Sequence, residues 1–303
     1  MKRFTLITGL IAWICCALTR LLRIPVALVL NQFRVEIIRR PSGRRLTPLD
    51  RIFFFIANVG WLFVRTAIQL VWGRSQVILI PDLPAPYTIS QGNLAIPRRY
   101  NSKVKLIGPI VELHEDPNSE DTRVVRELAG SKRPLIYAAV SGPRVERETL
   151  ARILLDALQG MNGYQIVLSR GDPTGDKTPH HVDGIIVFDW VENQDELIKA
   201  SDLVVSRAGH GTIMRSMIHG KPMLLVPIPD HTEQYGNALR AKSLHVAEII
   251  DQNKLNHELL KSTIDKVLSD KEYSLNAARI GRETGRDAVS TACDAIQALT
   301  IRT

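Results

Sequence analysis

The chain has 303 residues, of which 45% are hydrophobic and 23% charged, and its formal net charge is +8. This length and balance fit a globular protein of about two domains and exclude a disordered or fibrous chain. The 3 cysteines, two of them adjacent, form neither a disulfide framework nor a zinc pattern, so a reducing cytosol is the simplest interpretation.

The excess positive charge is confined to the start of the chain. Residues 1–75 contain 12 Lys and Arg against 2 acidic residues, whereas the remainder contains 27 basic and 29 acidic residues. Cationic side chains beside apolar surface suit an anionic membrane face, where each contributes about 1 kcal/mol. A solvated basic face or attraction to nucleic acid is the alternative. No nucleic-acid-binding motif accompanies the charge, so we expect no nucleic-acid partner.

Two apolar stretches lie in this basic part. Residues 4–19 follow Met1-Lys2-Arg3 like a signal peptide or short anchor, but a spanning helix needs about 20 residues. Residues 52–72 are long enough, but they enclose Arg65, which is costly inside a bilayer. Core helices, helices lying in the membrane plane and true spans all stay open. The first two together are favoured, because basic residues flank both stretches.

The first half of the chain alternates helical and extended patterns. Residues 22–31 read as a helix end, a proline break and a buried strand, 48–71 as a helix, and 76–81 and 103–108 as strands. This order predicts α/β organisation. We expect a first domain over 1–110, a polar linker over 111–133 with a short helix at 120–129, and a second domain over 134–303.

The second domain repeats strand and helix more regularly. Strands are predicted at 134–140, 164–168, 185–188, 203–205 and 223–226, and helices at 145–158, 213–219, 232–243, 256–268 and 283–300. Short apolar strands that alternate with helices are typical of a parallel sheet with helices on both faces.

A glycine-rich turn joins the strand at 203–205 to the following helix. Glycines allow a ligand to approach the backbone, and the free N–H groups of a helix N-terminus favour an anion. The turn therefore predicts a phosphate cradle made of Gly209, His210, Gly211 and Thr212. The alternative is a helix cap at Thr212 or a tight turn, since short glycine motifs often occur by chance.

A second motif, residues 227–234, follows the strand at 223–226, at the end of a sheet where open α/β folds bind ligands. Glu233 and Gln234 together accept and donate hydrogen bonds, which suits a sugar. Asn237 lies one helical turn later on the same face, and His231 could contact phosphate or sugar. Helix capping is the alternative role. A phosphate cradle beside such a pair indicates a nucleotide-sugar.

These motifs give the chain a family resemblance. Over residues 134–270 it resembles the donor-binding C-terminal domain of GT-B glycosyltransferases of family 28, the group with the UDP-GlcNAc transferase of peptidoglycan synthesis and archaeal homologues. The resemblance implies an α/β, GT-B-like fold of two Rossmann-like parallel-sheet domains, the N-terminal one incomplete by ~100 residues. It also implies that the last helix crosses back to the first domain. The shared pattern comprises Asp189-Trp190-Val191, Ser201-Asp202, 206–212, Gly220-Lys221-Pro222, Glu233-Gln234 and Asn237-Ala238.

The resemblance implies further site residues. Ser141-Gly142 would close on the diphosphate, and Arg207 would pair with phosphate or form a salt bridge. Trp190 would stack on the base while the backbone at Val191 reads the base edge, unless both only pack in the core. The implied donor site comprises Ser141, Gly142, Arg207, Gly209, His210, Gly211 and Thr212 for the diphosphate, Trp190 and Val191 for the base, and His231, Glu233, Gln234 and Asn237 for the sugar.

Two features depart from the family pattern. No histidine precedes His114, so a general base in the first domain has no candidate and the catalytic residue stays unassigned. Five residues before Gly220, the family has a glutamate that binds the ribose hydroxyls, whereas this chain has Arg215. An arginine cannot accept hydrogen bonds from a diol, so we do not assign Arg215 to the ribose.

The sequence thus predicts transfer of a hexose or N-acetylhexosamine, such as GlcNAc, from a UDP-sugar to a lipid-linked or envelope acceptor. The UDP-sugar would be a co-substrate, and we expect neither a metal nor a cofactor. The chain would lie in the cytoplasm, peripherally on the inner membrane face, with a partner subunit that supplies the acceptor site. The alternative is a catalytically degenerate nucleotide-sugar-binding or scaffold protein.

Overall fold

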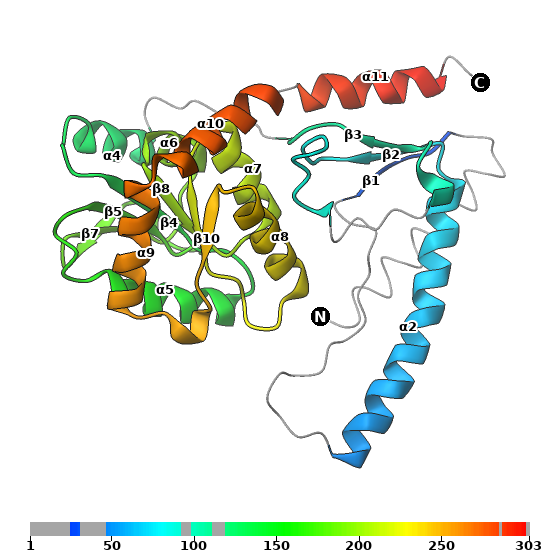
Figure 1. The fold of residues 1–303 in the computed structure, drawn as a ribbon, viewed down its shortest axis with the longest axis horizontal. Coiled ribbons are helices and arrows are strands. Elements are labelled where there is room, and N and C mark those ends of the chain that lie inside the picture. Colours follow the sequence, from blue (N-terminus) through cyan, green and yellow to red (C-terminus); the bar gives the residue numbers. More distant parts are fainter. Residues whose placement is uncertain (1–24, 31–46, 92–97, 111–118, 285–286, 301–303) are drawn as a thin grey trace. The chain divides into compact units, whose positions relative to one another are not determined.

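The structure is a computed structural model that describes residues 25–30, 47–91, 98–110, 119–284 and 287–300. It divides into two compact units, Met1–Ile110 with Arg286–Thr303, and Val111–Gly285 (Figure 1). The apolar stretch at residues 4–19 lies outside the described residues. None of the helices in the described ranges has the length and hydropathy that a bilayer crossing requires.

The first unit contains a small parallel sheet in the order β1-β2-β3. Its central strand alternates between two clusters, as the period of two in a strand requires. Ile78 packs with Trp72 at the end of α2, whereas Leu79 packs with Ala295 of α11. The last helix therefore packs on β2. The elements are β1 (Ala27–Val29), α2 (Pro48–Arg74), β2 (Val77–Ile80), η1 (Arg98–Tyr100), β3 (Val104–Leu106) and α11 (Ala288–Thr300).

Helix α2 begins at a well-defined cap. The Asp50 amide donates to Thr47 Oγ1 at 3.2 Å, the Thr47 amide donates to the Asp50 carboxylate at 2.9 Å, and Pro48 occupies the first turn. The first half of this helix carries large apolar side chains that are exposed. They are Leu49, Ile52, Phe53, Phe55, Ile56, Val59 and Phe63.

The second unit is built on a seven-stranded sheet in the order β10-β9-β8-β4-β5-β7-β6, in which only β6 runs antiparallel. The strands are β4 (Leu135–Ala139), β5 (Gln165–Ser169), β6 (His180–Val182), β7 (Ile185–Phe188), β8 (Leu203–Ser206), β9 (Met223–Leu225) and β10 (Ala247–Ile249). The helices are α4 (Glu120–Leu128), α5 (Arg144–Leu158), α6 (Gln194–Ala200), α7 (His210–Ile218), α8 (Thr232–Ser243), η2 (Gln252–Lys254), α9 (His257–Ser269) and α10 (Lys271–Thr284).

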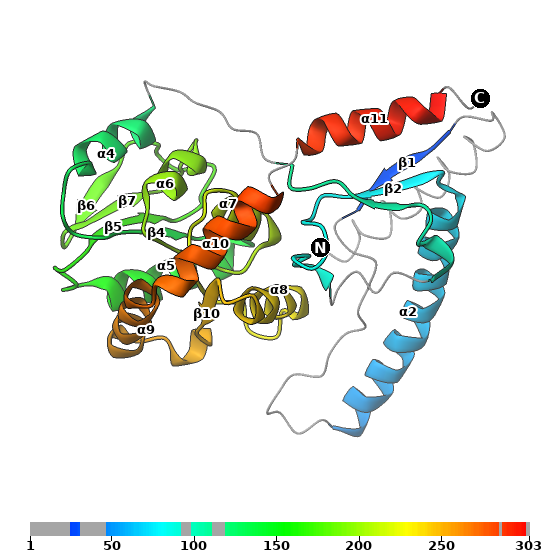
Figure 2. The same cartoon turned by 45° about the horizontal axis from the view of Figure 1, so that its top comes forward.

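Helices cover both faces of this sheet (Figure 2). The even-numbered residues of β4, such as Ile136 and Ala138, pack with Leu154 of α5 and Ile264 of α9. Helix α6 packs on the other side of β4 and contacts α4 and α7. Because both faces are covered, every residue of the central strands β4 and β8 is buried, and nearly all of them are apolar.

The chain order reverses between β4 and β8. From β4 the chain moves outward to β5 and β7, and it then returns to β8 on the other side and continues to β9 and β10. Open α/β sheets bind ligands beyond the carboxyl ends of the strands at such a switch point. The registers align these ends, with Ala139 paired to Ser169 on one side and to Ser206 on the other.

The structure differs from the predicted elements in three places. The helix expected over 283–300 is α11, which begins at Ala288, and a further helix, α10, precedes it where the sequence analysis predicts none. The connection after β5, where the sequence analysis predicts no element, contains the hairpin strand β6, in which His180 and His181 lie. Strand β10, too short to stand out in the sequence, extends the sheet beyond β9. Helix α4 falls within the predicted linker, and the domain boundaries remain a prediction.

Candidate functional site

The loops that follow β4 and β8 lie side by side, because Ala139 and Ser206 are paired where these strands end. The first loop holds Ser141 and Gly142, both exposed, and Gly142 has a φ of 113°, which favours glycine. The second holds the predicted cradle from Gly209 onward. The switch point therefore brings together two segments that are 67 residues apart or more along the chain.

Both loops lead into helices whose N-cap residue caps the first turn with no side chain. Helix α5 begins after Pro143 and α7 after Gly209, and neither N-cap makes a side-chain hydrogen bond. By contrast, a side chain accepts from the first-turn amides of α2, α4, α6, α8 and α9. Free amides and the helix dipole favour an anion, so the two helix N-termini that flank the switch point suit a diphosphate.

The cradle also has room for a ligand. At Gly209 and at Gly211, no described atom beyond the chain neighbours and the helix's own backbone lies within 4 Å of where a Cβ would be. Gly209 has a φ of −63° and a ψ of 136°, which any residue can adopt. The local backbone therefore does not require glycine here, whereas close approach of a phosphate would.

Arg207 lies beneath the cradle and is fully buried. Its guanidinium donates to Gln252 Oε1 at 3.0 Å and to the backbone carbonyl of Glu146 in α5. Burial lowers the pKa of Arg207 to about 10, against the attraction of Glu146. The side chain ties the loop after β8 to α5 and to η2, and it is not exposed to a phosphate in this conformation.

The two residues predicted to hold a base line a pocket of about 390 Å³. Trp190 is partly exposed, whereas Val191 is 2% exposed. The N–H and C=O groups of Val191 have no backbone partner among the residues that the structure covers. An unpaired donor and acceptor on one residue can read the edge of a base. The pocket is lined by Trp190, Val191, Glu192, Asn193, Gln194, Asp195 and Arg215.

Asp121 of α4 holds this loop in place. Its buried carboxylate accepts from the Asn193 amide at 2.6 Å, and the Glu192 amide also stabilises it. Burial raises the pKa of Asp121, and these hydrogen bonds oppose the rise. Sequence reasoning missed Asp121, because it lies in the predicted linker. A serine cap at Ser119 followed by two acids was the available signal.

Arg215 lines the same pocket and forms an ion pair with Asp195. The second oxygen of Asp195 lies 3.0 Å from Nε2 of His219, and the Asp195 side chain is only 6% exposed. Arg215 is therefore bound to a carboxylate and is not a free phosphate ligand. Sequence reasoning also missed Asp195, for which the Asn193 cap at the start of α6 was the only hint.

The residues predicted to hold the sugar follow β9. They differ in whether their side chains already form hydrogen bonds within the protein. Glu233 is partly exposed and makes no hydrogen bond or ion pair with any residue in the described ranges. Gln234 Oε1 accepts from the Ile228 amide at 2.8 Å, and Nδ1 of His231 accepts from the Gln234 amide at 3.3 Å. Asn237 is 1% exposed and donates to the Ala208 carbonyl at 3.3 Å. Only Glu233 presents an uncommitted carboxylate.

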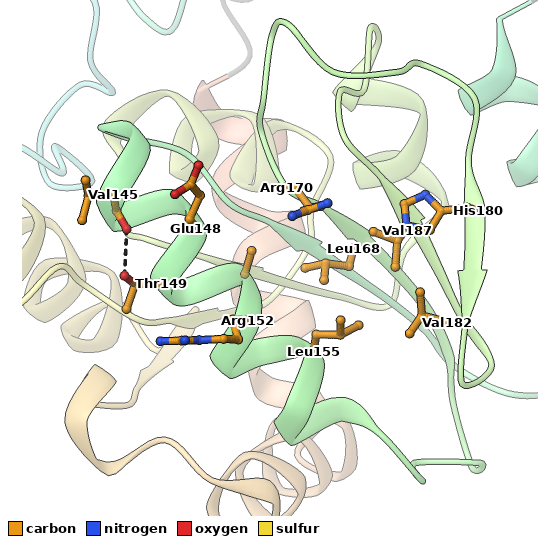
Figure 3. A pocket seen from close by; sticks show the side chains of 11 residues that line it. Val145, Glu148, Thr149, Arg152, Leu155, Leu168, Arg170, His180, Val182 and Val187 are labelled. Atoms are coloured by element: carbon orange, nitrogen blue, oxygen red, sulfur yellow. Dashed lines mark hydrogen bonds between the residues drawn. The ribbon is translucent and has the colours of Figure 1, made fainter.

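A larger pocket of about 520 Å³ lies between α5 and the strands β5, β6 and β7 (Figure 3). It exists because the connection from β5 to β7 contains a hairpin strand in place of a covering helix. Arg152 projects from the helix side, and Arg170 and His180 project from the sheet. None of the predicted site residues lines it, so the smaller pocket next to the cradle fits the expected chemistry better.

The sequence matches known glycosyltransferases. The profile of the glycosyltransferase family 28 C-terminal domain matches residues 142–292. An uncharacterized glycosyltransferase of Methanosarcina acetivorans is 28% identical over 272 residues, covering 87% of this chain and 64% of the relative. A UDP-N-acetylglucosamine–N-acetylmuramyl-(pentapeptide) pyrophosphoryl-undecaprenol N-acetylglucosamine transferase of Desulforamulus reducens is 30% identical over 131 residues, covering 42% of this chain and 34% of the relative.

Solved structures share the fold at low identity. The calicheamicin glycosyltransferase CalG4 superposes with a TM-score of 0.58 and 13% identity, covering 91% of this chain and 69% of that one. The spinosyn rhamnosyltransferase SpnG gives a TM-score of 0.54 and 15% identity, covering 76% and 57%. The chain spans between 61% and 64% of the length of the Methanosarcina relatives. Its fold is that of the GT-B glycosyltransferases, and over residues 142–292 it belongs to the glycosyltransferase family 28 C-terminal domain family.

Proposed function

We propose that this chain is a glycosyltransferase that transfers a hexose or N-acetylhexosamine, GlcNAc in the first instance, from a UDP-sugar to a lipid-linked or envelope acceptor. The observation that carries the proposal is the pair of helix N-termini, α5 and α7, at which the N-cap residue makes no side-chain hydrogen bond. They meet at the switch point of a GT-B fold, next to an open glycine cradle.

In this reaction the acceptor hydroxyl attacks the anomeric carbon of the sugar, and the bond from that carbon to the diphosphate breaks. The negative charge that develops on the leaving diphosphate is stabilised by the amides that follow Gly142 and Gly209, because preorganised donors act best where charge appears. Glu233 accepts hydrogen bonds from the sugar hydroxyls. Trp190 and Val191 hold the base. These parts need no metal ion or cofactor.

The donor and acceptor classes rest on the relatives. The name of the Desulforamulus reducens relative contains a UDP-N-acetylglucosamine donor and a pyrophosphoryl-undecaprenol acceptor. Its similarity covers 42% of this chain. We propose that a partner subunit supplies the acceptor site, and we assign no residue of this chain as the proton acceptor.

Calorimetry tests the donor site directly. We expect UDP and UDP-GlcNAc to bind with micromolar affinity and UDP-glucose more weakly, whereas GDP-mannose should not bind measurably. Binding without release of UDP, in the presence of a membrane extract that supplies acceptors and partners, would favour the alternative of a degenerate binding protein. If none of the four nucleotides binds, the proposed function is wrong.

The proposal also places the chain on an anionic membrane face. The exposed apolar residues of α2 form one broad helical stripe, at positions 49, 52, 53, 55, 56, 59 and 63. This stripe lies within the part of the sequence that carries the excess basic charge. Such a helix lies in the interface, with its apolar side among the lipid chains.

Liposome flotation tests this placement. The chain should float with vesicles that contain phosphatidylglycerol and less with purely zwitterionic vesicles. Phe55→Asp with Phe63→Asp should abolish flotation. Leu239→Asp is the matched control, because Leu239 is 61% exposed on α8 of the other unit. Equal flotation of both variants would refute the role of α2.

A further inference from the structure

The nucleoside pocket next to the cradle has an unusual polar wall. Asp195, the most buried acid that lines it, has both carboxylate oxygens engaged, one by Arg215 and the other by Nε2 of His219. The other acid of the lining, Glu192, forms an ion pair with Lys177 at 2.5 Å. In the described pocket, therefore, each carboxylate is already paired with a basic side chain.

What this wall offers to a ligand follows from its groups. The side chain of Arg215 lines the pocket and is 29% exposed, and its guanidinium only donates hydrogen bonds. The carboxamide of Gln194 is a neutral acceptor, which binds a hydroxyl less strongly than a carboxylate does. A ribose differs from a deoxyribose by one hydroxyl, whose hydrogen needs an acceptor. The pocket lacks an unpaired carboxylate among the described residues to supply it.

The energetic consequence is that the pocket should discriminate little between a ribose and a deoxyribose. A site rejects an analogue without a hydroxyl strongly only when the loss leaves a buried polar group of the site unpaired. Arg215 stays paired with Asp195 whether or not the hydroxyl is present, and its exposed N–H groups remain in contact with water. Removing the hydroxyl therefore leaves neither Arg215 nor Asp195 unpaired.

We propose that this pocket does not select for the ribose 2′-hydroxyl, and that the donor class extends to 2′-deoxyribonucleoside diphosphate sugars. The inference rests on the proposed function, because it concerns the nucleoside half of the same donor site. Arg215 is the specificity-determining residue, acting through its ion pair with Asp195.

The test compares UDP with 2′-deoxy-UDP on the unmodified protein by calorimetry. We expect the two dissociation constants to differ by less than tenfold. A preference of tenfold or more for UDP overturns the inference and leaves the proposed function standing, whereas failure of both nucleotides to bind overturns the two together.

A variant checks the role of the ion pair. Arg215→Glu places a carboxylate on the pocket wall and should raise the preference for UDP at least fivefold over that of the unmodified protein. Arg279→Glu is the control for the charge change, because Arg279 forms an exposed ion pair with Glu283 on α10, outside the pocket, and it should leave the ratio unchanged. If Arg215→Glu does not fold, Arg215→Gln, which releases Asp195 without adding a charge, should raise the ratio in the same direction. An unchanged ratio in a folded variant contradicts the inference.

Discussion

Replacing Gly209 by alanine separates the binding role of the cradle from its structural role. The backbone at Gly209 has a φ of −63°, and no described atom outside the immediate chain lies within 4 Å of the new methyl group. The substitution therefore introduces neither a clash nor backbone strain. At a helix N-cap, exchanging glycine for alanine costs up to about 1 kcal/mol. For a unit of this size, that lowers the melting temperature by about 2–4 °C.

The effect on the donor should be larger. A phosphate that accepts from the first amides of α7 must approach the backbone over the space that the methyl group fills. Hydrogen bonds to a charged group contribute about 1.5–3 kcal/mol each, so losing one or two of them weakens binding at least about tenfold. We expect Gly209→Ala to bind UDP at least tenfold more weakly at a nearly unchanged melting temperature.

Calorimetry with UDP and a thermal melt of the apoprotein measure the two effects. Gly163→Ala is the control, because Gly163 also has open space around the position of a Cβ but lies far from the switch point in sequence, before β5. It should change neither quantity. If Gly209→Ala is folded and binds UDP as the unmodified protein does, the phosphate is not held at this cradle.

Three further predictions concern other parts of the second unit. Glu233→Gln should lower the affinity for UDP-GlcNAc about tenfold or more and leave the affinity for UDP within twofold, because Glu233 is assigned to the sugar and a charged hydrogen bond is lost; equal losses for both ligands would contradict the assignment. Although burial opposes ionisation of Glu248, hydrogen bonds from Lys242, Lys266 and a tyrosine lower its pKa to about 2. Its stabilising contribution is therefore present above about pH 4.5 and is lost as the pH falls toward 2, so Glu248→Gln should flatten the melting temperature between pH 5 and 3; an unchanged slope would show that other groups cause it. Gly281→Ala should destabilise the unit by more than about 2 kcal/mol, since the new Cβ would lie 2.3 Å from a backbone carbonyl of α7; urea unfolding measures it, and a smaller loss would mean that α10 can shift.

The sequence predicts the central strands of the second unit well, because these strands are short apolar runs bounded by turns. The run at 185–188 and the helix at 232–243 have the same bounds in the structure. Strand β6 escapes prediction because its histidines are exposed and carry no apolar pattern. Helix α10 escapes it because small or polar residues such as Ala277, Gly281 and Thr284 make up much of its buried face.

The part of the candidate site that can be predicted from the sequence is the part in which backbone groups would bind the ligand. The glycines of the cradle show in the sequence, since only glycine lets a ligand approach so closely. The hydrogen bonds and ion pairs that the side chains form cannot be predicted from the sequence. That Gln234 and Asn237 hydrogen-bond to backbone groups, and that Arg215 pairs with Asp195, depends on contacts between distant segments.

Helix α4 gives the region ahead of β4 an unexpected importance. Its Asp121 accepts hydrogen bonds from the Asn193 and Glu192 amides, which belong to the loop that we propose to bind the base. A chimera that exchanges donor halves at a junction after Leu128 would separate this carboxylate from the loop that it anchors. Domain exchange in this protein should therefore be made ahead of Ser119, so that the helix travels with the nucleotide-binding half.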